Sequence, residues 1–292
     1  MRVGILTSGG DCQALNATMR GLALTLYRNV KDVEIIGFLD GYKGLMYEKY
    51  RKMKPNDFYD ILNVGGTILG SSRCPFKRMR VIENGFDKVK AMKNTYKKLN
   101  LDCLVVLGGN GSIKSANMLS QEGLNVIALP KTIDNDAWGT DYTFGYSSAT
   151  AIATRYLDEI KTTAASHSRV FVIEVMGHKV GHICLSAGIA AGADVILLPE
   201  IPYDINKVAS KIENRRKRGK NFSVVVVAEG AKSIGGEITV MNTRDNGSGV
   251  DNTKLGGIGQ NVAIQLQQIT GLEARNTTLG YMQRGGTPTA FD

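Results

Sequence analysis

Short apolar runs alternate with longer amphipathic segments along this chain, and this alternation limits the folds open to it. The apolar runs predict strands at 3–7, 33–39, 104–107, 126–129, 170–175, 195–198 and 224–228. Helical patterns lie at 14–27, 86–99, 147–163 and 261–269, with further helices after Ser112, after Gly177 and before Gly219. Strands that are apolar throughout are buried on both faces. The sequence therefore predicts an α/β protein with mostly parallel sheets covered by helices on both faces.

Length and composition exclude several other classes of protein. The 292 residues suffice for one large domain or two ordinary ones, without disulfides to hold the core together. Hydrophobic residues at 43% and charged residues at 22% exclude a disordered or collagen-like chain. The four cysteines form no Cys-x-x-Cys pair, and no signal peptide opens the chain, so we expect a cytoplasmic protein with reduced thiols. The most apolar stretch, 183–199, is too short and too polar to cross a membrane.

The chain is basic, because 36 lysines and arginines outnumber 27 acidic residues to give a net charge of +9. Such a charge could serve nucleic acid, an anionic membrane or a small phosphorylated ligand. Aromatic residues make up only 7% and do not interleave with the basic ones, which argues against nucleic acid. The basic run 215–218 is read as a solvated helix end.

Two glycine-rich loops each follow a predicted strand and precede a predicted helix. They are 7–11, Thr-Ser-Gly-Gly-Asp, and 108–112, Gly-Gly-Asn-Gly-Ser. Consecutive glycines let backbone N–H groups converge on a phosphate, although either loop alone could be a tight turn. Neither has the Gly-x-Gly-x-x-Gly spacing of a dinucleotide oxidoreductase or the Gly-x4-Gly-Lys-[Ser/Thr] pattern. Because both follow strands of a parallel sheet, we expect them to face one crevice.

A polar segment, 130–136, directly follows the predicted strand at 126–129. In extended backbone alternate residues share a face, so Thr132, Asp134 and Asp136 are expected to point together. Two carboxylates beside phosphate-binding loops suggest one general base and one magnesium ligand. The alternative is an Asx-rich turn that caps the next helix.

Arginines and histidines supply further candidates. Arginine forks match phosphate oxygens, and the candidates are Arg73, Arg78, Arg169, Arg275 and Arg284. His178 and His182 could share a helix face as metal ligands, but no third ligand is obvious. We therefore favour histidines at a helix N-terminus or a subunit contact.

Taken in order, the motifs resemble the 6-phosphofructokinases. The matching segments are 4–11, 15–17, 65–67, 70–73, 108–112, 132–136, 174–177 and 279–286, and the resemblance covers essentially the whole chain. It implies two Rossmann-like lobes with the active site in the cleft between them, in a homo-oligomer (tetramer or dimer) with shared active sites. Residues 1–145 plus 284–292 would form the phosphoryl-donor lobe and 146–283 the sugar-phosphate lobe. The C-terminal part of the family fold would continue beyond residue 292.

The implied reaction is phosphoryl transfer from ATP, with Mg²⁺, to the 1-hydroxyl of fructose 6-phosphate, giving fructose 1,6-bisphosphate in glycolysis. Asp134 would be the base, Thr132 would hold the transferring group, Gly10 and Arg169 would complete the catalytic set, and Asp136 and Asn110 would hold the metal. The donor would contact Gly10, Arg73, Arg78, Gly109, Asn110, Gly111, Ser112 and Lys131. The sugar phosphate would contact Thr132, Asp134, Arg169, Met176, Gly177, His178, Glu229, Arg275, Tyr281 and Arg284. Of these, Arg169 and Arg275 would reach over from a neighbouring subunit.

Several positions depart from the family pattern or divide its members. Asn110 stands where Asp is usual, His178 where Arg is common, and Tyr281 where the bacterial ATP enzymes have His. In the family's effector site Arg20 is kept but Leu24 replaces the second basic residue, so the resemblance does not extend to classical allosteric control.

The choice of phosphoryl donor depends on two residues. Gly111 goes with ATP, because an acidic side chain there would collide with and repel the α-phosphate, whereas Lys131 is common in pyrophosphate users. We predict ATP, since a flexible lysine can swing aside. The alternatives are a diphosphate-dependent phosphofructokinase and, because of Asn110, a nucleotide-binding regulatory protein with weak catalysis.

Overall fold

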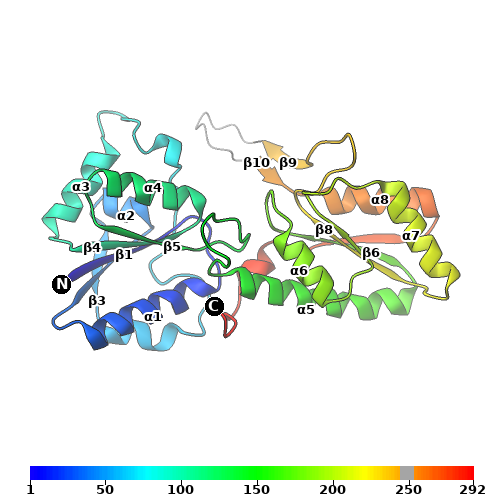
Figure 1. Cartoon of the computed structure of the whole chain (residues 1–292), viewed down its shortest axis with the longest axis horizontal. Helices are drawn as coiled ribbons and strands as arrows, with labels where there is room; N and C mark the ends of the chain where they lie inside the picture. The colour runs from blue at the N-terminus through cyan, green and yellow to red at the C-terminus, as the bar shows by residue number, and fades with distance from the viewer. Residues whose placement is uncertain (244–252) are drawn as a thin grey trace. The chain divides into compact units, whose positions relative to one another are not determined.

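The computed structural model describes residues 1–243 and 253–292, which form two compact units (Figure 1). The first unit contains Met1–Ser148 and Arg284–Asp292, and the second contains the described residues from Ala149 to Gln283. Each unit has its own sheet and its own buried core. The assignment of one lobe to the donor and the other to the sugar stays a prediction.

The first unit is built on a five-stranded sheet in the order β3-β2-β1-β4-β5. Its strands are β1 (Arg2–Ser8), β2 (Glu34–Phe38), β3 (Tyr50–Met53), β4 (Cys103–Gly108) and β5 (Val126–Pro130), all parallel except β3. Helix α1 (Ala14–Asn29) covers one face, and α2 (Tyr42–Met46), α3 (Lys88–Lys98) and α4 (Asn110–Gln121) cover the other (Figure 1). Two short 3₁₀ helices, Pro55–Ile61 and Phe76–Arg78, lie between β3 and α3.

The apolar runs of the sequence explain why this sheet lies in the buried core of the first unit. Every residue of β4, from Cys103 to Gly108, is buried, as expected for a parallel strand covered on both faces. Leu6, Phe38 and Leu104 from three neighbouring strands pack in one core with Tyr42 of α2. The last residue, Asp292, packs against the same unit, where its carboxylate accepts hydrogen bonds from the backbone N–H groups of Gly145 and Ser148.

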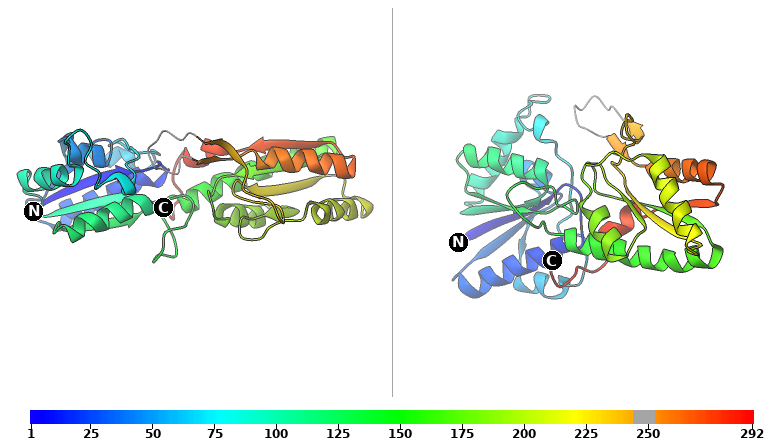
Figure 2. Two further views of the ribbon diagram at one scale, coloured as in Figure 1. Left: turned by 90° about the horizontal axis from the view of Figure 1, so that it is seen from above. Right: turned by 45° about the vertical axis from the view of Figure 1, so that its right-hand side comes forward.

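The second unit has a four-stranded parallel sheet in the order β11-β6-β8-β7. Its strands are β6 (Val170–Val175), β7 (Val195–Leu197), β8 (Ser223–Ala228) and β11 (Ala274–Thr278). Helices α5 (Tyr146–His167) and α6 (His182–Ala190) cover one face, and α7 (Ile205–Lys217) and α8 (Ile258–Thr270) cover the other, as Figures 1 and 2 show. An antiparallel pair, β9 (Val240–Thr243) and β10 (Thr253–Leu255), and a 3₁₀ helix, Gly280–Arg284, complete the described elements.

The predicted α/β class and the mostly parallel sheets are confirmed, and each predicted strand and helix is present within a few residues of its expected ends. The pattern does not predict β3, β9, β10 or β11. The sequence of β11, Ala-Arg-Asn-Thr-Thr, is polar because this strand lies at the edge of its sheet and is half exposed. In the part of the chain that the structure describes, no helix is both long and apolar enough to span a bilayer.

Candidate active site

The two glycine-rich loops lie together at the carboxyl edge of the first sheet. They follow β1 and β4, which are neighbouring parallel strands with Ser8 paired to Gly108. Ser112 Oγ, in the second loop, donates a hydrogen bond of 2.9 Å to Ser8 Oγ. The expected juxtaposition of the two loops is therefore present, and it comes from strand order and register alone.

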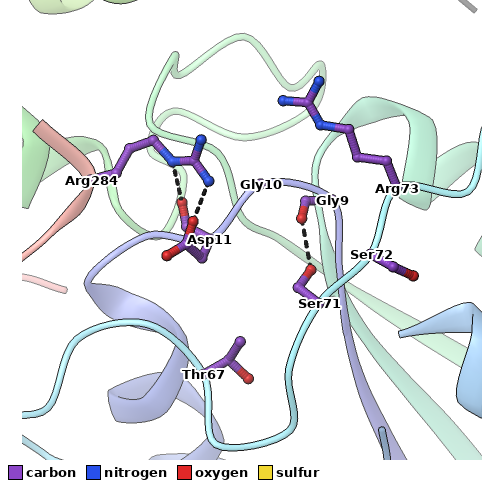
Figure 3. Close-up of a pocket in the computed structure, with 8 residues that line it drawn as sticks. All are labelled: Gly9, Gly10, Asp11, Thr67, Ser71, Ser72, Arg73 and Arg284. Atoms are coloured by element: carbon purple, nitrogen blue, oxygen red, sulfur yellow. Dashed lines mark hydrogen bonds and ion pairs between the residues drawn. The ribbon is translucent and has the colours of Figure 1, made fainter. Parts of the chain in front are cut away.

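A cavity of about 390 Å³ opens beside the first loop (Figure 3). Two hydrogen bonds join its walls: Ser71 Oγ donates to the carbonyl of Gly9 at 2.7 Å, and Gly9 N donates to the backbone carbonyl of Ser72 at 3.1 Å. The left-handed φ of Gly9, +90°, suits a glycine at this turn. The lining residues are Gly9, Gly10, Asp11, Thr67, Ser71, Ser72, Arg73 and Arg284. Gly10 and Arg73, both predicted to bind the donor, are thus brought to one cavity.

Arg284 enters this cavity through an ion pair with Asp11 (Figure 3). Its Nε also donates to the carbonyl of Asp11 at 3.0 Å. A Cβ placed on Gly10 would lie 3.1 Å from the Arg284 guanidinium, so the missing side chain of Gly10 leaves room for this approach. Sequence reasoning assigned Arg284 to the sugar and did not select Asp11, which could have been found as the only carboxylate in the first loop.

Lys131 joins the polar segment 130–136 to the first glycine-rich loop. Its side chain is buried, at 4% exposed, and its ammonium donates to the carbonyl of Gly10. Burial lowers the pKa of Lys131, and the nearby Cys12, Asp11 and Asp134 partly oppose that shift. The Lys131 amine is therefore held against the loop that lines the cavity.

The segment from Thr132 to Asp136 is a turn, so the predicted extended backbone with three side chains on one face is wrong. Asn135 has a left-handed φ of +53°, and Asp134 N donates to Thr132 Oγ1 at 3.1 Å. The Asn135 amide stabilises the turn by donating to the carbonyl of Asp141 and accepting from Thr143 N. Asparagine tolerates this left-handed conformation, and its amide bonds to backbone groups six and eight residues further along the chain.

Asn110 and Asp136, the two predicted metal ligands, are adjacent. Asn110 Nδ2 donates to Asp136 Oδ2 at 3.0 Å, although the two residues are 26 positions apart. Residues 1–243 and 253–292 hold no group of three His, Cys, Asp or Glu side chains that could bind a metal. A single carboxylate with an amide oxygen nonetheless fits Mg²⁺, which is commonly held by one or two carboxylates together with substrate phosphates.

Two further donor candidates differ in their surroundings. Arg78 pairs with Glu83 at 2.5 Å and is not among the residues that line the cavity, so its contact with a donor stays a prediction. A Cβ on Gly111, at the start of α4, would meet no atom within 4 Å in the described part of the chain. The space next to Gly111 is therefore open.

In the second unit, the carboxyl ends of β6 and β8 carry a second group of candidates. Glu229 Oε1 accepts hydrogen bonds from His178 N at 2.8 Å and from Gly177 N at 3.3 Å. Burial raises the pKa of Glu229, while these two N–H groups lower it. His178 has a left-handed φ of +50°, a conformation that is uncommon for residues other than glycine. Glu229 therefore fixes the shape of this loop.

Gln283 and Tyr281 lie at the same edge. Met176 N donates to Gln283 Oε1 at 3.3 Å, and Leu279 N donates to the carbonyl of Glu174 at 3.0 Å, so the end of β11 is joined to the end of β6. Tyr281 is 67% exposed. A cavity of about 380 Å³ lies next to this loop and is lined by His178, Lys179, Lys232, Gly236, Glu237, Ile238, Val240 and Leu255.

Arg169 and Arg275 lie at the opposite, amino edge of the second sheet. Arg169 directly precedes β6, and Arg275 is the second residue of β11. The six residues of β6 span about 20 Å at roughly 3.3 Å per residue. That length separates both arginines from Met176 and Gly177 within one copy of the chain, so the structure does not bring these four predicted sugar ligands together.

Comparisons with known proteins agree with this geometry. Residues 2–292 match the family described as Phosphofructokinase. The chain is 52% identical to an ATP-dependent 6-phosphofructokinase of Spirochaeta thermophila over 99% of this chain and 79% of that protein. It is 43% identical to a pyrophosphate–fructose 6-phosphate 1-phosphotransferase of Amycolatopsis mediterranei over 100% of this chain and 83% of that protein. The solved phosphofructokinase of Saccharomyces cerevisiae has a TM-score of 0.85 at 30% identity, covering 99% of this chain and 39% of the yeast chain.

Proposed function

Because this chain belongs to the phosphofructokinase family, we propose that it transfers the terminal phosphoryl group of ATP to the 1-hydroxyl of fructose 6-phosphate. The product is fructose 1,6-bisphosphate, and the reaction is a step of glycolysis in the cytoplasm. The observation that carries the proposal is the meeting of two glycine-rich loops with the Thr132–Asp136 turn at one sheet edge. Loops of this kind present backbone N–H groups to phosphates.

The first unit would bind the donor and start the transfer. The phosphates of ATP would lie against Gly10 and Arg73, in the cavity that Arg284 also lines. Asp134 would take the proton from the 1-hydroxyl of the sugar. The hydroxyl oxygen would then bond to the terminal phosphorus of ATP as the bond to the leaving ADP breaks. Thr132 would hold the transferring group, because its hydroxyl is part of the turn that presents Asp134.

Asp136 and Asn110 would hold Mg²⁺. When bound, this ion offsets the negative charge of the donor phosphates and orients them. Their adjacency supports the assignment, since one carboxylate and one amide oxygen leave coordination sites for phosphate and water. The neutral amide of Asn110 makes the site less negative than a pair of carboxylates.

Two observations support ATP over pyrophosphate. The open space beside Gly111 leaves room for the part of a nucleotide that pyrophosphate lacks. A relative named as ATP-dependent is 52% identical to this chain, whereas the relative named for pyrophosphate is 43% identical. Lys131 is the one feature that favours pyrophosphate, but its ammonium is bonded to the carbonyl of Gly10.

The second unit would bind the sugar at the carboxyl edge of its sheet. Met176, Gly177 and His178 would contact the sugar through the loop that Glu229 fixes, with Tyr281 beside them. Arg169 and Arg275, at the other edge, would serve the 6-phosphate of a sugar bound to a different copy. Their separation from Met176 within one copy supports a homo-oligomer whose active sites are shared.

The direct test is turnover by the purified protein with fructose 6-phosphate and either Mg-ATP or pyrophosphate. We expect rapid formation of fructose 1,6-bisphosphate with ATP. Faster turnover with pyrophosphate would favour the diphosphate-dependent alternative and leave the acceptor assignment standing. Nucleotide binding without turnover of either donor would favour the regulatory alternative.

A further inference from the structure

Both arginines at the amino edge of the second sheet contact one carboxylate that sequence reasoning did not select. Arg169 Nε donates to Glu273 Oε2 at 2.6 Å, and Arg275 pairs with Glu273 Oε1. The two oxygens of a single carboxylate thus each bind a different guanidinium. We propose that Glu273 is the positioning residue that holds Arg169 and Arg275 as one phosphate-binding pair, an inference that rests on the proposed function.

Strand register explains why these three side chains meet. Val170 N, at the start of β6, donates to the carbonyl of Glu273 at 3.0 Å, so Glu273 and Arg169 stand side by side at the ends of neighbouring strands. Glu273 directly precedes β11 and Arg275 is its second residue, and alternate residues of extended backbone share a face. The carboxylate is therefore placed between both guanidiniums by the backbone of β6 and β11.

The cluster contributes little to the stability of the fold. The side chains of Arg169, Glu273 and Arg275 are 27%, 41% and 58% exposed, and exposed ion pairs stabilise proteins only weakly. Neither guanidinium has another side-chain partner among the described residues. The cluster instead orders its own side chains, since the Glu273 carboxylate limits the conformations of two long, flexible arginines.

Charge and donor geometry favour a positioning role over competition with the ligand. Two arginines and one carboxylate leave a net charge of +1, which still attracts a phosphate. Each guanidinium has five N–H donors and Glu273 engages one edge of each, so donors remain for phosphate oxygens. Without Glu273 the two like charges would repel one another, and their side chains would have to be ordered when the phosphate binds.

The test is Glu273→Gln in the full-length protein, with Glu159→Gln as the matched control. Glu159 is an exposed carboxylate of the same unit that pairs with Arg155 at 2.9 Å, far from the cluster in sequence. We expect the KM for fructose 6-phosphate to rise about tenfold in Glu273→Gln, because two side chains lose their order. The KM for ATP and kcat should change less than about twofold, a change too small to count as a lost contact. Glu273→Asp should give an intermediate KM, and the control should match the wild type.

Binding of fructose 6-phosphate measured by calorimetry without donor separates this inference from the proposed function. A selective loss of sugar-phosphate affinity in Glu273→Gln would support the positioning role even if turnover with ATP were absent. An unchanged or tighter affinity would overturn it, the latter because Glu273 would then compete with phosphate. Equal losses for ATP and fructose 6-phosphate, or loss of the wild-type oligomer in size-exclusion chromatography, would also overturn it.

Discussion

The sheets of the two units arrange their candidate residues in different ways. In the first unit, both glycine loops and Lys131 gather at one edge, joined by contacts such as Ser112 to Ser8 and Lys131 to Gly10. In the second unit, Glu229 and Met176 lie at the carboxyl edge, and Arg169 and Arg275 lie at the amino edge. The first arrangement is complete within one copy of the chain. The second is divided between two edges, so we infer that sugar binding depends on another copy and that assembly leaves donor binding largely intact.

The largest effect is expected for the base of the first unit. Asp134→Asn should lower kcat about a thousandfold while sparing the affinity for both substrates, since the amide keeps the shape of the turn but cannot accept the proton. Steady-state kinetics and equilibrium binding of each substrate measure the two parts of this prediction. Asp60→Asn, an exposed site in the same unit, is the control. A near-normal kcat in Asp134→Asn would contradict the assignment of Asp134 as the general base.

A smaller effect is expected from adding a charge beside the donor. Gly111→Asp should weaken use of ATP about a hundredfold, because a carboxylate would face the donor phosphates and like charges brought together cost several kcal/mol. Turnover with ATP and with pyrophosphate should be compared in the same variant. Gly21→Asp, on an open site of α1, controls for the added charge. Unchanged use of ATP would mean that the donor does not pass Gly111.

The amino edge of the second unit should affect the sugar phosphate and not the donor. Arg275→Ala should raise the KM for fructose 6-phosphate about tenfold or more, since a charge-assisted phosphate contact contributes about 1.5–3 kcal/mol. The KM for ATP and kcat are the internal comparison, and Arg216→Ala is an exposed arginine control in the same unit. A fall in ATP affinity without a fall in fructose 6-phosphate affinity would mean that Arg275 contacts the donor and not the sugar phosphate.

The smallest effect concerns stability and the carboxyl edge. Burial raises the folded-state pKa of Glu229 above its ordinary value of 4.5, so its stabilising contribution is full below that pH and is lost as the pH rises through the raised pKa. Glu229→Gln should lack this dependence. Urea unfolding between about pH 4 and pH 7 should show the wild type losing stability relative to the variant across that window. If the free energy of unfolding depended on pH in the same way in both proteins, the raised pKa of Glu229 would be contradicted.

Local sequence patterns predict the sheets well and the side-chain partners poorly. The apolar runs of β4 and β8 identify buried strands because burial on both faces requires them. The turn at Thr132–Asp136 is mispredicted, since the left-handed Asn135 depends on bonds to Asp141 and Thr143. Glu273 is 104 residues from Arg169, and only the pairing of β6 with β11 brings them together. Such pairs follow from strand register, which a single sequence does not contain.

A mixing experiment tests most directly whether Arg275 serves the active site of a different copy of the chain. Asp134→Asn protein and Arg275→Ala protein would be dissociated together and reassembled in equal amounts. At low fructose 6-phosphate each should keep about a tenth or less of wild-type activity. If Arg275 acts on a neighbouring copy, we predict recovery of about a quarter of wild-type activity, because random pairing gives that share of sites both intact residues. If Arg275 acts within its own copy, no site regains both residues. Activity no higher than that of the separate proteins, with reassembly confirmed, would contradict the shared site.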